Sequence, residues 1–225
     1  MHHPFFDLLV KATLATLEMV FVSAGIAMLF GLPLAILLTI TRPQGLWPVP
    51  AIGRPLGVMV DLTRAVPFII LLVLLIPLTR FLVGTSLGTT AVIVPLSITA
   101  IPYFARIAEV SLKDVNPELI KGVRAMGATR AKVVRSVLLP EALAGLVSGL
   151  TVMLVTLISA SAMAGVVGAG GLGDLAIRYG YQRFNTAMML WVVGVLVVLT
   201  ISVQFLGNTV SAGIRSRQGM FGKTV

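Results

Sequence analysis

The chain contains no cysteine and only two histidines among its 225 residues. Without cysteine there is no disulfide framework, no thiolate nucleophile and no zinc-ribbon spacing. His2 and His3 alone are too few to make a buried metal site. The sequence therefore predicts no metal site and does not indicate a redox compartment.

Charged residues are also scarce. They make up 11% of the chain, whereas hydrophobic residues make up 57%, and soluble domains carry about 25% charged residues. The net charge of +9 comes from basic residues in the gaps between apolar runs. That distribution suits anionic lipid headgroups and cytoplasmic loops rather than nucleic acid. We expect a membrane protein with no nucleic-acid partner.

Five stretches are long and apolar enough to cross a bilayer as helices, because about 20 apolar residues span its hydrocarbon core. They are Leu14 to Ile40, Val58 to Leu78, Leu87 to Phe104, Leu143 to Val167, and Ala187 to Val210. The first could instead be a signal sequence, but its apolar run is long, and Asp7 and Glu18 spoil the positive leader expected of one. The predicted fold is all-α, a polytopic membrane protein with five transmembrane helices.

The basic residues predict the orientation, since cytoplasmic loops are enriched in lysine and arginine. With the N-terminus outside and the C-terminus in the cytoplasm, twelve basic residues lie inside and four outside. The inner set is Arg42, Arg54, Arg106, Lys113, Lys121, Arg124, Arg130, Lys132, Arg135, Arg215, Arg217 and Lys223, and the outer set is Lys11, Arg80, Arg178 and Arg183. Arg64 falls within the second span and is not counted.

Residues 1–225 show no linker, low-complexity tract or convincing repeat, so we expect one domain whose one sizeable loop is Ile107 to Pro140. Asn116, followed by Pro117 and an acid, is typical of a helix start. Gly127 can end this helix, and Thr129 can cap a second one with an apolar residue every three or four positions. The loop is thus predicted to be two short helices around a glycine elbow. On physical grounds alone it could be a basic interfacial connector.

The second half of this loop resembles the inner-membrane permease subunits of ATP-binding-cassette importers. Their loop carries Glu-Ala-Ala, three residues, Gly, nine residues, Ile, one residue, and Leu-Pro. Here Gly127 is followed by Val137 and by Leu139–Pro140, but Lys121, Gly122 and Val123 stand in place of Glu-Ala-Ala. This charge reversal puts in doubt any partner contact made by that Glu in the family.

The resemblance implies a type I importer permease that works by alternating access. Two copies would form the pathway, two separate ATP-binding subunits would bind ATP and Mg, and an extracytoplasmic binding protein would deliver substrate. The loop would then be a coupling helix that docks on the ATPase. The coupling residues implied are Arg124, Ala125, Met126, Gly127, Ala128 and Thr129. We therefore expect no catalytic residue and no cofactor in this chain.

Four stretches narrow the resemblance to methionine-import permeases of the bacterial inner membrane. They are RAVPFIILLVLLIPLTRFLVGTSLG from Arg64, VIVPLSITAIPYFAR from Val92, RAMGATRAKVVRSVLLPEAL from Arg124 and SAMAGVVGAGGLGD from Ser161. Neighbouring subfamilies share much of the loop pattern, so methionine is the less specific part of this prediction.

The segment GAGGLG, Gly168 to Gly173, matches the glycine spacing of a dinucleotide-binding loop. It follows a membrane helix rather than a strand, and no acid for a ribose lies about 20 residues further on. We interpret it as an outer turn whose flexibility accompanies gate movement. The phosphate-binding pattern G-x-x-x-x-G-K-[ST] is absent, so energy must come from a partner or a gradient.

Charges and prolines in the spans have structural and functional interpretations. Asp61–Arg64 and Arg106–Glu109 have the spacing of ion pairs that neutralise each other on one helix face, although charges at membrane depth also mark substrate or proton paths. The prolines at positions 67, 77, 95 and 102 predict bends.

The fourth span carries Ser159, Ser161 and Met163. These residues could serve helix packing. Alternatively, they line a substrate pathway or gate.

Two other functions stay open. A gradient-driven secondary transporter is disfavoured because the chain lacks two matching halves and has few ionisable residues deep in its spans. A membrane-embedded enzyme is disfavoured because no metal cluster, nucleophile and base, or paired acids appear.

Overall fold

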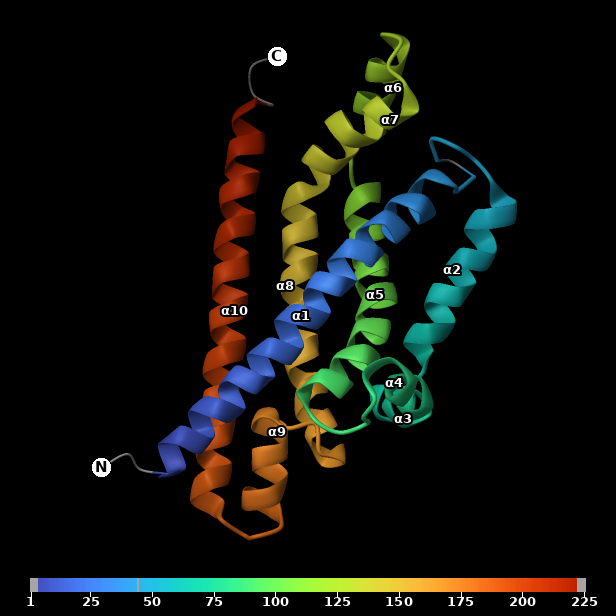
Figure 1. The fold of residues 1–225 in the computed structure, drawn as a ribbon. Coiled ribbons are helices and arrows are strands. Elements are labelled where there is room, and N and C mark those ends of the chain that lie inside the picture. The colour runs from blue at the N-terminus through green and yellow to red at the C-terminus, as the bar shows by residue number, and fades with distance from the viewer. Residues whose placement is uncertain (1–3, 44, 222–225) are drawn as a thin grey trace.

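The computed structural model describes residues 4–43 and 45–221, and over these residues the regular structure is entirely helical (Figure 1). Four helices are long and apolar enough to cross a membrane: α1 Pro4–Ile40, α5 Thr89–Lys113, the run that contains α8 Leu139–Ala164, and α10 Thr186–Phe221. They confirm the first, third, fourth and fifth predicted spans. His2, His3 and Lys223 lie outside the described residues.

The second predicted span, Val58 to Leu78, is present as a bent span rather than one straight helix. The chain forms α2 Pro50–Ala65, then α3 Phe68–Leu74 at a bend of 100°, and then α4 Ile76–Val83. The break lies at Val66, whose ψ of 125° is extended, because a residue that precedes proline is disfavoured in the α region. The bend predicted at Pro67 is therefore confirmed, and Pro77 lies in the first turn of α4, whereas Pro95 and Pro102 sit inside an uninterrupted α5.

The core lies where α5 packs between α1 and α8, and it includes Met19, Leu96, Phe104 and Met153, all at most 2% exposed. Helix α1 approaches α5 closely: a Cβ on Gly31 would lie 2.9 Å from the Ile101 carbonyl oxygen. A glycine at this position lets the two helices pack backbone to backbone.

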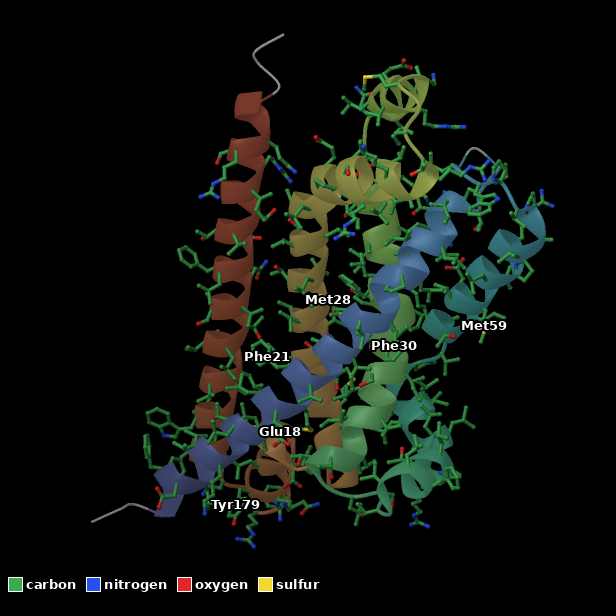
Figure 2. The ribbon with its side chains drawn as sticks, turned by 45° about the horizontal axis from the view of Figure 1, so that its top comes forward. Glu18, Phe21, Met28, Phe30, Met59 and Tyr179 are labelled. Atoms are coloured by element: carbon green, nitrogen blue, oxygen red, sulfur yellow. The ribbon has the colours of Figure 1, made fainter. Side chains whose placement is uncertain are left out.

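Large apolar side chains also cover the outside of the bundle. Along α1, Phe21, Met28 and Phe30 are 53%, 45% and 58% exposed, and Met59 on α2 is 67% exposed (Figure 2). Helix α10 is mostly exposed and packs chiefly along α8. Apolar surface of this extent fits lipid or another protein chain rather than water.

At the end of the bundle where α1 begins, the glycine-rich segment forms a compact helical hairpin (Figure 1). It comprises a 3₁₀ turn Gly165–Val167, α9 Gly171–Leu175, and a π-helical turn Ala176–Tyr181. The N–H of Leu172 donates to Thr16 Oγ1 of α1 at 2.9 Å. A Cβ on Gly173 would lie 2.2 Å from the Ala162 carbonyl oxygen. These glycines permit close backbone packing, and the segment forms short helices rather than a simple outer turn.

Candidate coupling loop and membrane pathway

The inner loop is the segment between α5 and α8. Its first arm is α6 Pro117–Ala125, which begins and ends where the sequence predicts. Asn116 caps the helix by accepting a hydrogen bond from the Glu118 N–H at 2.9 Å. Gly127 ends it with a φ of +83°, a left-handed conformation that costs glycine nothing.

The elbow that follows α6 is presented to solvent. Helix α6 has no buried residue, Met126 is 80% exposed, and a Cβ on Gly127 would meet no atom within 4 Å. In Figure 1, α6 and α7 project from the end of the bundle opposite the start of α1. The elbow, Gly127 to Thr129, is therefore sterically open to a partner.

The second arm is not a separate short helix, which corrects the sequence prediction. Thr129 accepts a hydrogen bond from the Lys132 N–H at 3.4 Å and begins α7 Arg130–Val133. A π-helical turn, Val134–Leu138, then joins α7 to α8 without a loop, so that Arg130–Val167 is one helical run. The loop is thus shorter than the predicted Ile107 to Pro140, because α5 extends to Lys113. Movement of the elbow can pass directly into α8.

The loop between α1 and α2 contacts this second arm, a contact that the sequence did not reveal. The Arg130 guanidinium lies 4.7 Å from the centre of the Trp47 ring, within the range of a cation–π interaction. Arg and Trp have no sequence spacing that would predict this pairing, since the contact depends on the bend between α1 and α2.

Both predicted ion pairs are present, and they belong to one larger network. Arg106 contacts Glu109 at 2.6 Å and also Asp61 of α2 at 2.5 Å, while Arg64 lies 3.5 Å from Asp61. Glu109 is fully buried and also contacts Arg42 and Lys113 at 2.5 and 3.2 Å. The two acids therefore offset only part of the charge of four cations, and the network ties α2 and the end of α1 to α5.

The candidate pathway residues do not share one face of α8. Ser159 is exposed and Met163 is 53% exposed, whereas Ser161 is 1% exposed and donates to the Ile158 carbonyl at 2.7 Å. The exposed stripe recurs at helical spacing along α8 and into the 3₁₀ turn that follows it: Val152, Thr156, Ser159, Met163 and Val166. The structure thus brings Ser159 and Met163 together and places Ser161 in the packed interior.

A neighbouring hydroxyl extends this stripe onto α5. The Tyr103 hydroxyl lies 3.2 Å from Thr156 Oγ1, and the Arg64 guanidinium lies 5.8 Å from the centre of the Tyr103 ring. The Tyr103 hydroxyl beside this stripe was missed by sequence reasoning. No local sequence pattern indicates the contact between Tyr103 and Thr156, because the two residues are 53 positions apart.

Among the described residues, no group of three or more His, Cys, Asp or Glu side chains is arranged to hold a metal ion. Two arrangements that can serve a function are the exposed elbow of the inner loop and the exposed stripe of α8.

The family of binding-protein-dependent transport system inner membrane components matches residues 28–216 of the chain. A probable D-methionine transport system permease protein MetI of Vibrio cholerae serotype O1 is 46% identical over 202 residues, which cover 90% of each chain. The D-methionine transport system permease protein MetI of Escherichia coli K12 is 47% identical over 165 residues, which cover 73% of this chain and 76% of the relative.

A solved structure shows the same arrangement of helices. It is described as an inward-facing conformation of the MetNI methionine ABC transporter, and it is 45% identical in sequence with a TM-score of 0.92. The match covers 95% of this chain and 99% of that chain. The overall fold of this chain is therefore similar to one already seen in a methionine ABC transporter.

Proposed function

The chain belongs to the family of binding-protein-dependent transport system inner membrane components, and from that premise we propose that it is the permease of an ATP-driven methionine importer. The proposal rests on one observation: about half of the aligned residues, over nine tenths of both chains, are identical in a relative named for D-methionine transport. The structural match to a methionine ABC transporter agrees with it. Import of methionine, including its D form, follows as the substrate prediction.

The partners in this proposal are a second copy of the chain, two ATP-binding subunits and an extracytoplasmic substrate-binding protein. The mostly exposed apolar surface of the bundle supports burial against lipid and a second copy. ATP and Mg would be bound by the ATP-binding subunits, and this chain would carry no catalytic residue of its own. The whole chain, residues 1–225, would act as one permease domain.

The coupling site in this proposal is the end of α6 with its elbow: Arg124, Ala125, Met126, Gly127, Ala128 and Thr129. Their support is exposure, since Met126 is 80% exposed and the space around Gly127 is open. Closure of the ATPase pair would move this elbow. Because Arg130–Val167 is one helical run, the movement would reach the exposed stripe of α8 without a flexible joint.

The substrate pathway would follow that stripe, with Ser159 and Met163 among its lining residues. A polarizable methionine side chain suits a thioether substrate or an apolar seal. Ser161 is buried and hydrogen-bonded inside the bundle, so its contribution would be to packing beside the gate.

The orientation proposed is N-terminus outside and C-terminus in the cytoplasm. In Figure 1 the start of α1 lies at the end opposite α6 and α7, whereas α10 ends on the same side as these two helices. If α6 meets a cytoplasmic ATPase, this arrangement places the start of α1 outside. The twelve-to-four distribution of basic residues agrees with it.

Uptake into reconstituted vesicles tests the function. Vesicles containing this chain, its ATPase and its binding protein should accumulate radiolabelled methionine only when ATP is supplied on the ATPase side. Omission of the ATPase should abolish uptake. Uptake driven by an ion gradient in the permease alone would favour the secondary-transporter alternative and overturn the proposal.

A further inference from the structure

A cavity of about 790 Å³ lies between the end of α1, the end of α5 and the inner side of α6. Its volume falls within the ~300–1,000 Å³ of typical small-molecule sites. Of the proposed coupling residues, Arg124 and Ala125 line it, whereas Met126, Gly127, Ala128 and Thr129 do not. The cavity is therefore distinct from the tip of the proposed coupling site.

The charged side chains that line the cavity all have one sign. They are Arg42, Lys113, Lys121 and Arg124, and no acidic residue lines it within the part of the chain that the structure describes. Two acids outside the lining contact three of these cations: Glu109 contacts Arg42 and Lys113, and Glu118 contacts Lys121. Four cations thus face two carboxylates, and Glu109 is shared with Arg106 as well. At least two positive charges stay uncompensated, which favours an anionic occupant.

The position of the cations indicates where that anion comes from. Arg42 lies two residues beyond the last residue of α1, and Lys113 is the last residue of α5. Ends of membrane-spanning helices lie at the level of the lipid headgroups, where basic pockets recognise anionic lipids. The rest of the cavity wall is largely apolar and includes Ile40, Leu46 and Ile120.

We propose that this cavity binds the phosphate group of an anionic phospholipid. The cations would hold the phosphate, and the apolar wall would contact the glycerol backbone and the start of an acyl chain. Under the topology proposed above the lipid belongs to the inner leaflet. Because residues of α1, α5 and α6 all line the cavity, the bound lipid would brace the first arm of the inner loop against the membrane bundle.

Native mass spectrometry of the full-length permease with its ATPase in detergent tests the site, since binding in detergent does not depend on leaflet or topology. The probes are dioleoyl phosphatidylglycerol and the zwitterionic dioleoyl phosphatidylcholine. The double variant Arg42→Gln, Lys121→Gln should bind phosphatidylglycerol about 25-fold more weakly, at about fivefold for each cation removed. Arg215→Gln, Arg217→Gln removes two exposed cations at the end of α10 and should leave binding unchanged.

Ile120→Phe provides a variant that fills the cavity and keeps its charge. It should also weaken phosphatidylglycerol binding. Neither Ile120→Phe nor the double variant of Arg42 and Lys121 should change phosphatidylcholine binding. Equal losses in the cavity and control double variants would show general surface attraction and overturn the site. Competition by millimolar inorganic phosphate would assign the cavity to a soluble anion, and binding only after removal of the ATPase would assign it to protein docking. Either result would overturn the lipid proposal.

Discussion

The buried carboxylate of Glu109 lies 2.5 Å from the guanidinium of Arg42, so an acid within α5 holds a residue just beyond the end of α1. Glu109 is fully buried, whereas the Arg42 side chain is 41% exposed. Burial of a carboxylate is tolerated only when cations or hydrogen bonds compensate for the lost hydration. The pair therefore holds α1 and α5 together on the side of the bundle where α6 projects.

Removal of this buried charge should destabilise the permease. Glu109→Gln leaves Arg42, Arg106 and Lys113 without their shared partner, and we expect a loss of about 3 kcal/mol, as for other broken buried pairs. Glu118→Gln is the control, because Glu118 and Lys121 are 74% and 72% exposed and exposed pairs contribute about 0–1 kcal/mol. Thermal unfolding in detergent should separate the two variants, and equal midpoints would show that the network is not structural.

The hairpin that contains α9 depends on glycine at its closest backbone contact. A Cβ on Gly165 would lie 2.2 Å from the backbone nitrogen of Asp174, and backbone atoms at this position cannot move aside easily. We expect Gly165→Ala to destabilise the permease by about 1–3 kcal/mol through overpacking. Gly194→Ala, where a Cβ meets no atom within 4 Å, should be neutral or slightly stabilising. A stable Gly165→Ala variant would contradict this packing.

Local features of the fold could be predicted from the sequence, and contacts between distant helices could not. Asn116, Gly127 and Thr129 act on their own backbone neighbourhood, so their residue types were sufficient to place the first arm and its elbow. The pairing of Asp61 with Arg106 joins residues 45 positions apart, and it depends on how α2 packs against α5. Pro67 predicted a bend in the second span but not its size, because hydropathy continues across Val66 and only the proline marks the change in direction.

The pathway prediction shows the same limit. Met153 and Met163 lie on one helix and cannot be distinguished by residue type. The structure buries Met153 completely in the core and leaves Met163 53% exposed. Ser161 lies two residues from both Ser159 and Met163, so on a helix it faces the opposite side. Helix periodicity could therefore have distinguished it from these two residues.

Met163→Ala tests whether the exposed stripe of α8 lines the pathway. It should change methionine uptake or uncoupled leakage several-fold, because it shortens a side chain at the proposed gate. Met28→Ala is the matched control, since Met28 is 45% exposed on α1. Rates are compared at equal membrane abundance. Indistinguishable uptake and leakage in the two variants would show that Met163 serves only helix packing.

The native absence of cysteine makes the orientation directly measurable by labelling. A single cysteine in place of the exposed Gln182 should react with a membrane-impermeant reagent added from outside. A cysteine in place of Ser216, which is exposed near the end of α10, should react only after the inner side is opened. The reverse pattern would contradict the proposed topology.

The central claim is that the elbow of the inner loop transmits ATP-driven movement to the transport pathway. Gly127→Asp adds a side chain and a negative charge where the structure shows open space, and Asp is among the residues that tolerate a left-handed backbone. The permease itself should therefore fold and insert normally. Gly213→Asp is the control, because Gly213 is also exposed and a Cβ there meets no atom within 4 Å.

The most direct measurement is ATP-driven methionine uptake by vesicles that contain the ATPase, the binding protein and each permease variant, with ATPase co-purification measured in parallel. We expect Gly213→Asp to match the native chain, and Gly127→Asp to lose both uptake and ATPase capture at normal permease abundance. Normal capture and uptake in Gly127→Asp would contradict the coupling role of the elbow.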